Sequence, residues 1–264
     1  MAVNLNGETR LFPIIGDPIK YARSPERMTE GFAARQHNGM CIPAEVPDGA
    51  LPDVMRAMAL VRNVDGLLVT MPHKFKVPAY CASTSDRTKL LGAVSVVRRN
   101  ANGSWHGDML DGLAFVKAQM DQGAKPQGAR ILLVGAGAAG SAIAIALLEA
   151  GANELIIHDA DESRTQKLLS VIAEFGNGRA RSGPPDPTGC DMVSNATSAG
   201  MASGDPLPVA ESLLKPGMFV GDVIAGHGLT PLLRAAQAAG CKTANGDQMV
   251  EAGQEMMLDF MMFR

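Results

Sequence analysis

The chain has 264 residues, a length at which two domains are plausible. Hydrophobic residues make up 46% of it and charged residues 19%, the balance of an ordinary globular protein, which excludes a disordered chain. The formal net charge of -3 leaves no basic footprint for nucleic acid, and an aromatic content of 4% argues against base-stacking platforms.

The cysteines and the apolar stretches argue against metal, secretion and membrane roles. Four widely spaced cysteines form no C-x-x-C pair, so we expect reduced thiols in a cytoplasmic protein and no metal site. The first ten residues contain no apolar secretion signal. The segment Ile131–Leu148 is uncharged over eighteen residues, but three glycines between Gly135 and Gly140 would weaken a membrane-spanning helix. We therefore expect no membrane segment.

Strand and helix patterns alternate along the first hundred residues. In chain order we expect strands at Leu11–Gly16, Met40–Val46, Gly66–Met71 and Ala93–Arg98, and helices at Pro25–His37, Leu51–Val61 and about Lys74–Ser83. Ser24 is expected to open the first helix, with Pro25 at its first position. This β-α-β-α-β series predicts an open, mostly parallel sheet covered by helices.

The alternation continues after a predicted helix at Leu110–Gln122 and a polar link at Gly123–Arg130. Later strands are expected at Ile131–Val134, Glu154–His158, Asp191–Asn195 and Met218–Asp222, and helices at Gly140–Ala150, Arg164–Phe175 and near Pro231–Ala239. The fold class is therefore α/β with two domains, at 1–107 and 108–246, and a C-terminal helix at 247–264 that joins the first domain.

A glycine-rich turn lies between a predicted strand and a predicted helix. Gly135, Gly137 and Gly140 fit the pattern G-x-G-x-x-G, in which the glycines allow a tight turn, close approach of a pyrophosphate and close helix–strand packing. Ala138 and Ala139, between the second and third glycines, are also expected to contact the cofactor, and the free N–H groups and dipole of the helix that opens there favour phosphate. The segment therefore predicts a Rossmann dinucleotide-binding domain.

An aspartate follows the next strand at the spacing expected for a ribose-binding acid. Asp159 lies 159 − 135 = 24 positions after the first glycine, where it would accept hydrogen bonds from the adenosine 2′-hydroxyl. It would repel a 2′-phosphate by about 1–4 kcal/mol at ~4 Å, depending on the local dielectric. Asp161 and Glu162 add negative charge, and Arg164 is the one base nearby. The sequence predicts NAD, and not NADP, as the cofactor.

At this point the chain resembles the shikimate and quinate dehydrogenases nearly from end to end. The similar segments are GDPIKYARSP (16–25), DGLLVTMPHK (65–74), LLGAVSVVRR (90–99), HGDMLDG (106–112), SNATSAGM (194–201) and GDVIAGHGLTPLL (221–233). The resemblance implies oxidation of a cyclic hydroxy acid, of the type shikimate to 3-dehydroshikimate, with Lys74 and Asp111 as the catalytic pair. Such a reaction removes a hydroxyl proton as hydride leaves, which a base within hydrogen-bond reach accomplishes.

The resemblance also implies the remaining site residues. Ser24, Thr70, Ser95 and Gln254 would bind substrate, with Gln254 at or next to the family's glutamine position. Asn195, Thr197, Val223 and Gly246 would contact the cofactor, together with the glycine-rich turn.

Several positions depart from the shikimate pattern. Ala22 and Ala225 stand where a serine and a tyrosine are usual, Leu68 and Ser95 where asparagines are usual, and Met109-Leu110 where the usual motif reads Asn-Thr. Because buried polar groups provide most discrimination between hydroxylated substrates, we expect the reaction type to be kept and recognition to have shifted. The preferred substrate would be a less hydroxylated or differently substituted ring acid, and shikimate or quinate would be turned over poorly. The alternative is that Tyr21, Arg23 or His73 restores the lost contacts.

Two other classes remain open. A regulatory or sensor protein would bind NAD without turnover, although it would have no need of Lys74 and Asp111 together. An NAD-linked methylene-tetrahydrofolate enzyme fits the glycine-rich turn but not segments 90–99 and 106–112 as well.

The expected partner is a small cyclic hydroxy acid, with no nucleic acid or membrane, and the chain would be a monomer or a homodimer.

Overall fold

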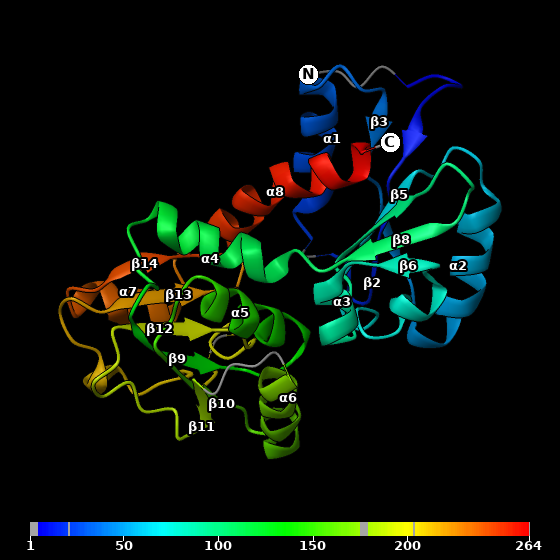
Figure 1. Cartoon of the computed structure of the whole chain (residues 1–264). Helices are drawn as coiled ribbons and strands as arrows, with labels where there is room; N and C mark the ends of the chain where they lie inside the picture. Colours follow the sequence, from blue (N-terminus) through cyan, green and yellow to red (C-terminus); the bar gives the residue numbers. More distant parts are fainter. Residues whose placement is uncertain (1–4, 21, 175–178, 203, 264) are drawn as a thin grey trace. The chain divides into compact units, whose positions relative to one another are not determined.

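The computed structural model describes residues 5–20, 22–174, 179–202 and 204–263, in two compact units (Figure 1). The first unit comprises Met1–Leu110 and Gly253–Arg264, and the second comprises Asp111–Ala252. Tyr21, and Phe175 at the predicted end of one helix, lie outside the described residues.

The first unit contains a six-stranded mixed sheet with the order β4-β2-β5-β7-β8-β6, and a separate parallel pair β1-β3. The strands are β1 Arg10–Leu11, β2 Ile14–Gly16, β3 Gly39–Met40, β4 Pro43–Glu45, β5 Gly66–Val69, β6 Ser83–Thr84, β7 Val96–Arg99 and β8 Trp105–Asp108. The helices are α1 Ser24–Ala34, η1 Asp48–Ala50, α2 Leu51–Leu60, η2 Val77–Tyr80 and α3 Asp86–Leu91.

Apolar strands and amphipathic helices form the core of this unit. Phe12 stacks on Phe32 of α1 at 4.2 Å between ring centroids, and both rings are buried. The C-terminal half of helix α8 (Gly246–Met262) packs on α1, where Leu258 fills the space that a Cβ on Gly31 would occupy, 2.4 Å away. Arg35, directly after α1, pairs with Glu255 and Asp259 of α8, which adds an ionic contact to the apolar one.

The structure differs in detail from several expectations for the first unit. The predicted helix Lys74–Ser83 is a series of turns followed by η2, because Pro78 lacks the N–H group that a helix needs there. The predicted strands Leu11–Gly16 and Met40–Val46 are each split into two. The strand predicted at Ala93–Arg98 is β7, which pairs antiparallel with β5. Ser24 is the first residue of α1 and makes no capping hydrogen bond.

The second unit is a parallel six-stranded sheet with the order β11-β10-β9-β12-β13-β14 (Figure 1). Its strands are β9 Arg130–Val134, β10 Glu154–His158, β11 Ala180–Ser182, β12 Met192–Asn195, β13 Phe219–Asp222 and β14 Lys242–Ala244. Its helices are α4 Asp111–Asp121, α5 Ala138–Glu149, α6 Glu162–Glu174, η3 Glu211–Leu213 and α7 Pro231–Ala238, followed by the first part of α8. The predicted α/β fold class, with a mostly parallel first sheet and a Rossmann-type second sheet, is confirmed.

The register of the second sheet brings its functional strand ends to one edge. Val134, the last residue of β9, pairs with His158 of β10 and with Asn195 of β12, and Asn195 pairs with Asp222 of β13. In parallel sheets of this kind ligands bind outside these carboxyl ends, at the point where the strand order reverses. Here the order reverses between β9 and β12.

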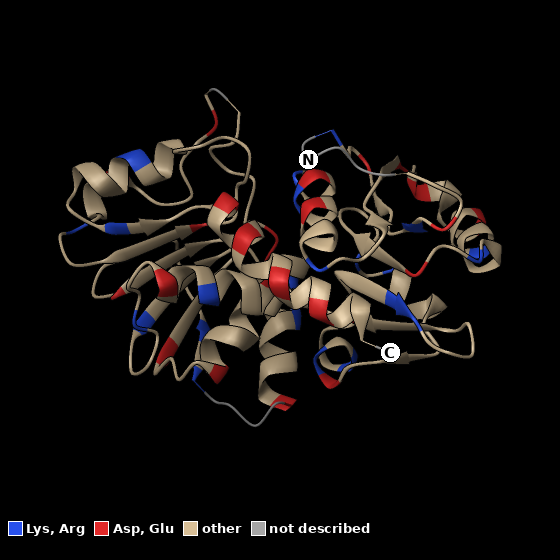
Figure 2. Cartoon of the chain, turned by 90° about the horizontal axis from the view of Figure 1, so that it is seen from above, with Lys and Arg blue, Asp and Glu red and all other residues tan. Residues whose placement is uncertain are grey.

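Charge and hydropathy of the described residues are unremarkable. Figure 2 shows Lys and Arg interspersed with Asp and Glu on the elements of both units. Among the helices formed by the described residues, none is both long and apolar enough to cross a bilayer.

Candidate active site

The glycine-rich turn of the second unit combines a positive-φ glycine with a close approach of helix to strand. Gly135 has φ +106°, a backbone conformation that other residues rarely adopt. A Cβ on Gly140 would lie 2.0 Å from the Gly135 carbonyl oxygen, so only glycine lets α5 start this close to β9. A Cβ on Gly137 would meet no described atom within 4 Å, which leaves open space at the N-terminus of α5.

This open space fits a cofactor pyrophosphate. Gly137 precedes α5 and offers no side-chain oxygen to the N–H groups of the first turn, which begins at Ala138 and Ala139. Those groups and the helix dipole favour an anion at this position. Gly135 and Gly140 thus show the tight turn and the close helix–strand packing that the sequence pattern predicts, and pyrophosphate approach at Gly137 stays a prediction.

Asp159 lies directly after β10, and its carboxylate is attached to the same turn. One oxygen accepts the N–H of Ala136 at 2.7 Å, and the other accepts the N–H of Asp161 at 2.9 Å. A carboxylate has about four acceptor positions, so two remain for ribose hydroxyls. Arg164 forms an ion pair with Asp161 at 3.5 Å. A hydrogen bond from the Ser163 hydroxyl lowers the pKa of Asp161, which keeps a second negative charge beside Asp159.

The other predicted cofactor residues of the second unit lie along the same sheet edge. Thr197 is close to the glycine-rich turn, since a Cβ on Gly135 would lie 2.8 Å from its methyl group. Its hydroxyl and backbone N–H both donate to the Asn195 side-chain oxygen, at 2.7 and 3.1 Å. The N–H of Val223 donates to the Asn195 carbonyl at 3.1 Å, and a Cβ on Gly246 would lie 2.4 Å from the Val223 carbonyl oxygen.

Sequence reasoning missed the buried acid that ties this edge together. Asp222, with no exposed surface, accepts hydrogen bonds from the Asn195 amide at 3.0 Å, the Ile224 N–H at 3.1 Å and the Thr230 hydroxyl at 2.7 Å. Burial raises the pKa of Asp222, and these hydrogen bonds lower it in part. The available sequence signal was an acid at the end of an apolar strand.

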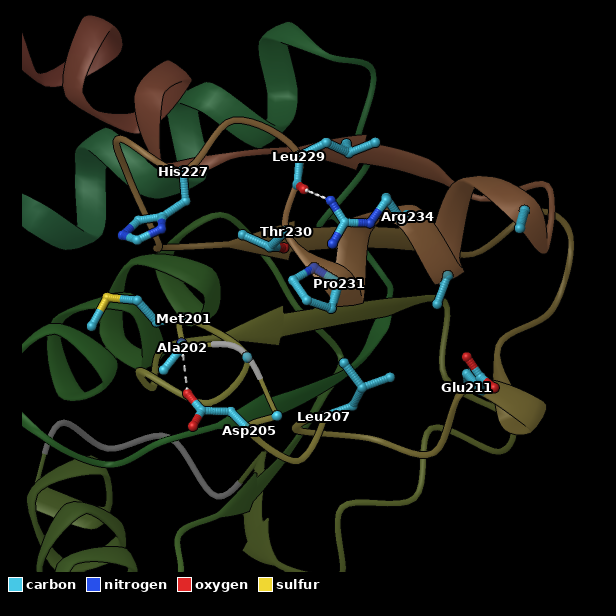
Figure 3. A pocket seen from close by; sticks show the side chains of 14 residues that line it. Met201, Ala202, Asp205, Leu207, Glu211, His227, Leu229, Thr230, Pro231 and Arg234 are labelled. Atoms are coloured by element: carbon cyan, nitrogen blue, oxygen red, sulfur yellow. Dashed lines mark hydrogen bonds between the residues drawn. The ribbon is translucent and has the colours of Figure 1, made fainter.

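A further cavity, of about 720 Å³, lies between the loop after β12 and the start of α7 (Figure 3). Met201, Asp205, His227 and Arg234 are among its lining residues, and the Arg234 guanidinium donates to the Leu229 carbonyl at 2.6 Å. It contains none of the residues that the sequence marks as cofactor-binding. Thr230 at its wall donates to Asp222, so the cavity borders the network that shapes the sheet edge.

In the first unit, tertiary contacts fix the segment that carries Lys74. The ring Nε2 of buried His73 lies 2.7 Å from the Val46 carbonyl oxygen, and the His73 N–H donates to the Thr70 carbonyl at 3.0 Å. The Lys74 carbonyl accepts the N–H of Val94 at 2.9 Å. Lys74 itself is half-buried, directly after a buried strand and a fixed turn. These contacts hold its backbone in place.

Thr70 and Ser95 lie near this segment. Thr70 is half-buried at the end of β5, and its N–H donates to the Ile15 carbonyl at 3.0 Å. Ser95 is buried, and its hydroxyl oxygen accepts the N–H of Leu110 at 2.9 Å. The carbonyl of Ser95 in turn accepts the N–H of Val69 at 2.9 Å.

Two predicted substrate residues have surroundings that the sequence could not indicate. Ser24 is half-buried at the start of α1. The Gln254 side-chain amide donates to the Arg27 carbonyl at 2.8 Å, so its nitrogen connects α8 to α1. Leu68, at the usual asparagine position, is 2% exposed in β5 and contributes apolar surface to the core.

Asp111 is the first residue of α4 and is buried. The next residue, Gly112, lets α4 approach α5 closely, since a Cβ there would lie 2.1 Å from the Ala142 carbonyl oxygen. Asp111 is therefore fixed to the helix that follows the glycine-rich turn. The described residues contain no group of three His, Cys, Asp or Glu side chains that could hold a metal ion.

The chain is similar in sequence to known proteins. Residues 14–97 match the family model of the shikimate dehydrogenase substrate binding domain. A shikimate dehydrogenase (NADP(+)) from Rubrobacter xylanophilus is 36% identical over 252 residues, which cover 93% of this chain and 88% of the relative.

Solved structures are similar over nearly the full length. Shikimate 5-dehydrogenase from Listeria monocytogenes, in complex with shikimate and NAD, has a TM-score of 0.89 at 26% identity and covers 100% of this chain and 95% of that one. Quinate dehydrogenase from Corynebacterium glutamicum, in complex with NAD, has a TM-score of 0.87 at 26% identity and covers 96% and 94%. The chain belongs to the shikimate dehydrogenase family.

Proposed function

We propose that the chain is an NAD-dependent dehydrogenase that oxidises a secondary hydroxyl of a cyclic hydroxy acid to a ketone. The observation that carries this proposal is the glycine-rich turn with Asp159 bonded to it, in a chain whose other unit carries Lys74 on a fixed turn. Family membership supports the reaction class, and the relatives crystallised with NAD support the cofactor.

Lys74 and Asp111 are the proposed catalytic pair. A bound nicotinamide would supply the hydride acceptor for this oxidation. Oxidising the alcohol to a ketone also requires loss of the hydroxyl proton, which is the task of the protein's own residues. Lys74 and Asp111 hold and move that proton, with Asp111 orienting the lysine ammonium and stabilising its charge. Thr70, Ser95 and Ser24 provide hydroxyl groups for the substrate. Gln254 is the fourth proposed substrate-binding residue.

The cofactor is held mainly by the second unit. The N-terminus of α5, with Gly135, Gly137 and Gly140, would bind the pyrophosphate, and Asp159 would bind the adenosine ribose. Asn195, Thr197, Val223 and Gly246 form the rest of the cofactor surface. Two carboxylates, Asp159 and Asp161, would face a 2′-phosphate at the ribose, which favours NAD over NADP.

The preferred substrate is proposed to carry fewer or differently placed hydroxyls than shikimate. Leu68 is an apolar, buried side chain, and Met109 and Leu110 are also buried. Ala22 and Ala225 have no hydroxyl to offer a substrate carboxylate. A substrate hydroxyl buried against such groups loses hydrogen bonds without replacement, which lowers kcat/KM for the more hydroxylated acid.

Cofactor preference tests the NAD assignment. We expect kcat/KM with NAD to exceed that with NADP by at least about 10-fold, equivalent to about 1.4 kcal/mol. Asp159→Asn removes the charge but keeps the size, so it should reduce the NAD/NADP ratio by about 5-fold or more, toward equal use. Steady-state rates with both cofactors, and with the cyclic hydroxy acid that the chain oxidises fastest, provide the ratio.

The matched control is Glu174→Gln, which neutralises an exposed carboxylate at the end of α6 and should leave the ratio unchanged. A wild-type preference for NADP would contradict the NAD assignment but not the reaction class.

A further inference from the structure

A buried carboxylate lies three residues before Asp111. Asp108 ends β8, is 5% exposed, and accepts two hydrogen bonds from the Arg87 guanidinium, both at 2.8 Å. The hydroxyl of Ser85 also donates to it, and so does the N–H of Met109, at 2.7 Å. Such a bidentate pair is geometrically specific, and its removal leaves a buried charge without its partner.

The segment between Asp108 and Asp111 depends on these polar groups. Met109 and Leu110 are buried apolar side chains, so they provide no hydrogen bond of their own. Their backbone N–H groups are bound by the Asp108 carboxylate and by the Ser95 hydroxyl, respectively. The last two peptide N–H groups before Asp111 are therefore held from the first unit.

The same residues hold the backbone of the lysine segment. The N–H of Ser95 donates to the Asp108 carbonyl at 2.9 Å, and the N–H of the preceding residue, Val94, donates to the Lys74 carbonyl at 2.9 Å. Within the first unit, consecutive residues thus bind the backbone of Lys74 and the backbone of Leu110, to which Asp111 is covalently joined.

Resting on the proposed function, we propose that Asp108, clamped by Arg87 and Ser85, is a positioning residue for proton transfer: it fixes the backbone turn from which Asp111 follows. Because Met109 and Leu110 have no polar side chains, the clamp of Arg87, Ser85 and Asp108 holds the backbone of this turn. Burial raises the pKa of Asp108, but hydrogen bonds from Arg87 and Ser85 lower it by more. The net pKa is below the usual value, so the carboxylate stays charged at neutral pH.

The test compares Asp108→Asn with wild type, with the cyclic hydroxy acid that the wild-type chain oxidises fastest. A misplacement of about 1 Å in a catalytic group can cost about 100-fold, so we expect kcat to fall about 10- to 100-fold. The Kd for NADH should stay within about twofold, because the proposed cofactor residues lie in the second unit. The apparent pKa of the kcat–pH profile should also move by at least about half a unit, because the Lys74–Asp111 pair would be altered.

Two further variants separate positioning from stability. Arg87→Lys keeps the positive charge but not the bidentate geometry, so it should show a smaller loss of kcat in the same direction. Asp86→Asn, an exposed neighbour paired with Lys89, should leave kcat and its pH profile unchanged.

An unchanged kcat per folded molecule and an unchanged pH profile in Asp108→Asn and Arg87→Lys, with only a lower melting temperature, would overturn the positioning proposal alone. Absence of turnover by the wild-type chain would overturn the proposed function, and the positioning proposal with it.

Discussion

Replacing Lys74 by Met should lower kcat by about 100- to 10,000-fold, the usual contribution of a positioned acid–base group. Met keeps most of the side-chain volume but cannot accept or donate the hydroxyl proton. The fold should persist, because the contacts that hold this segment come from His73 and from the Lys74 carbonyl, which the substitution leaves in place. Stopped-flow or steady-state rates, with circular dichroism for the fold, provide the measurement.

The control for this result is Lys89→Met, at an exposed position of α3, where the lysine forms an ion pair with the exposed Asp86 at 2.9 Å. It should leave kcat within about twofold, as surface ion pairs contribute little. Asp111→Asn should resemble Lys74→Met, and the double variant should be little worse than the poorer single variant, since groups that act as a unit are not additive. Near-normal turnover by Lys74→Met would refute the catalytic role.

Replacing Gly137 by Val should weaken binding of NADH by about 100-fold or more, equivalent to about 2.7 kcal/mol, with little change in stability. The backbone at Gly137 has φ −73° and ψ −167°, an extended conformation open to any residue, and a Cβ would meet no described atom within 4 Å. The new side chain would occupy the space proposed for the pyrophosphate. Fluorescence titration with NADH and thermal unfolding measure the two effects.

Substitutions at Gly7 and Gly140 are the controls for Gly137→Val. Gly7→Val, also in open space, should change neither NADH binding nor stability. Gly140→Ala should lower the melting temperature, because its Cβ would clash with the Gly135 carbonyl oxygen. Unchanged affinity for NADH in a folded Gly137→Val variant would place the pyrophosphate elsewhere.

The second unit was the more predictable part of the fold. The expected strand Glu154–His158 is β10 with identical bounds, and Ile131–Val134 differs from β9 by one residue. Continuous apolar runs and a glycine turn at fixed spacing are local signals, and they also identify the loop at the carboxyl edge of the sheet.

The first unit was less predictable because its short elements depend on distant partners. Strand β8 was missed since WHGD has no alternation of its own, and it forms by pairing with β7 and β6. The turn at Lys74 is fixed by the contact between His73 and Val46, 27 residues away.

The polar anchors of the candidate site were missed for the same reason. Arg87 and Asp108 are 21 residues apart, and Asn195 and Asp222 are 27 apart. A sequence shows that an acid follows a strand, but not which donor will meet it. The resemblance to a known family marked Lys74 and Asp111, whereas the groups that hold their backbones emerged only from the structure.

Substrate-dependent formation of NADH is the most direct test of the central claim. The purified chain is assayed with NAD against shikimate, quinate and ring acids that lack one or two of their hydroxyls. We predict NADH formation with at least one of these acids, and a kcat/KM for a less hydroxylated acid at least about 10-fold above that for shikimate. Efficient oxidation of shikimate would contradict the altered recognition. Binding of NADH with no turnover of any cyclic hydroxy acid would contradict the dehydrogenase itself.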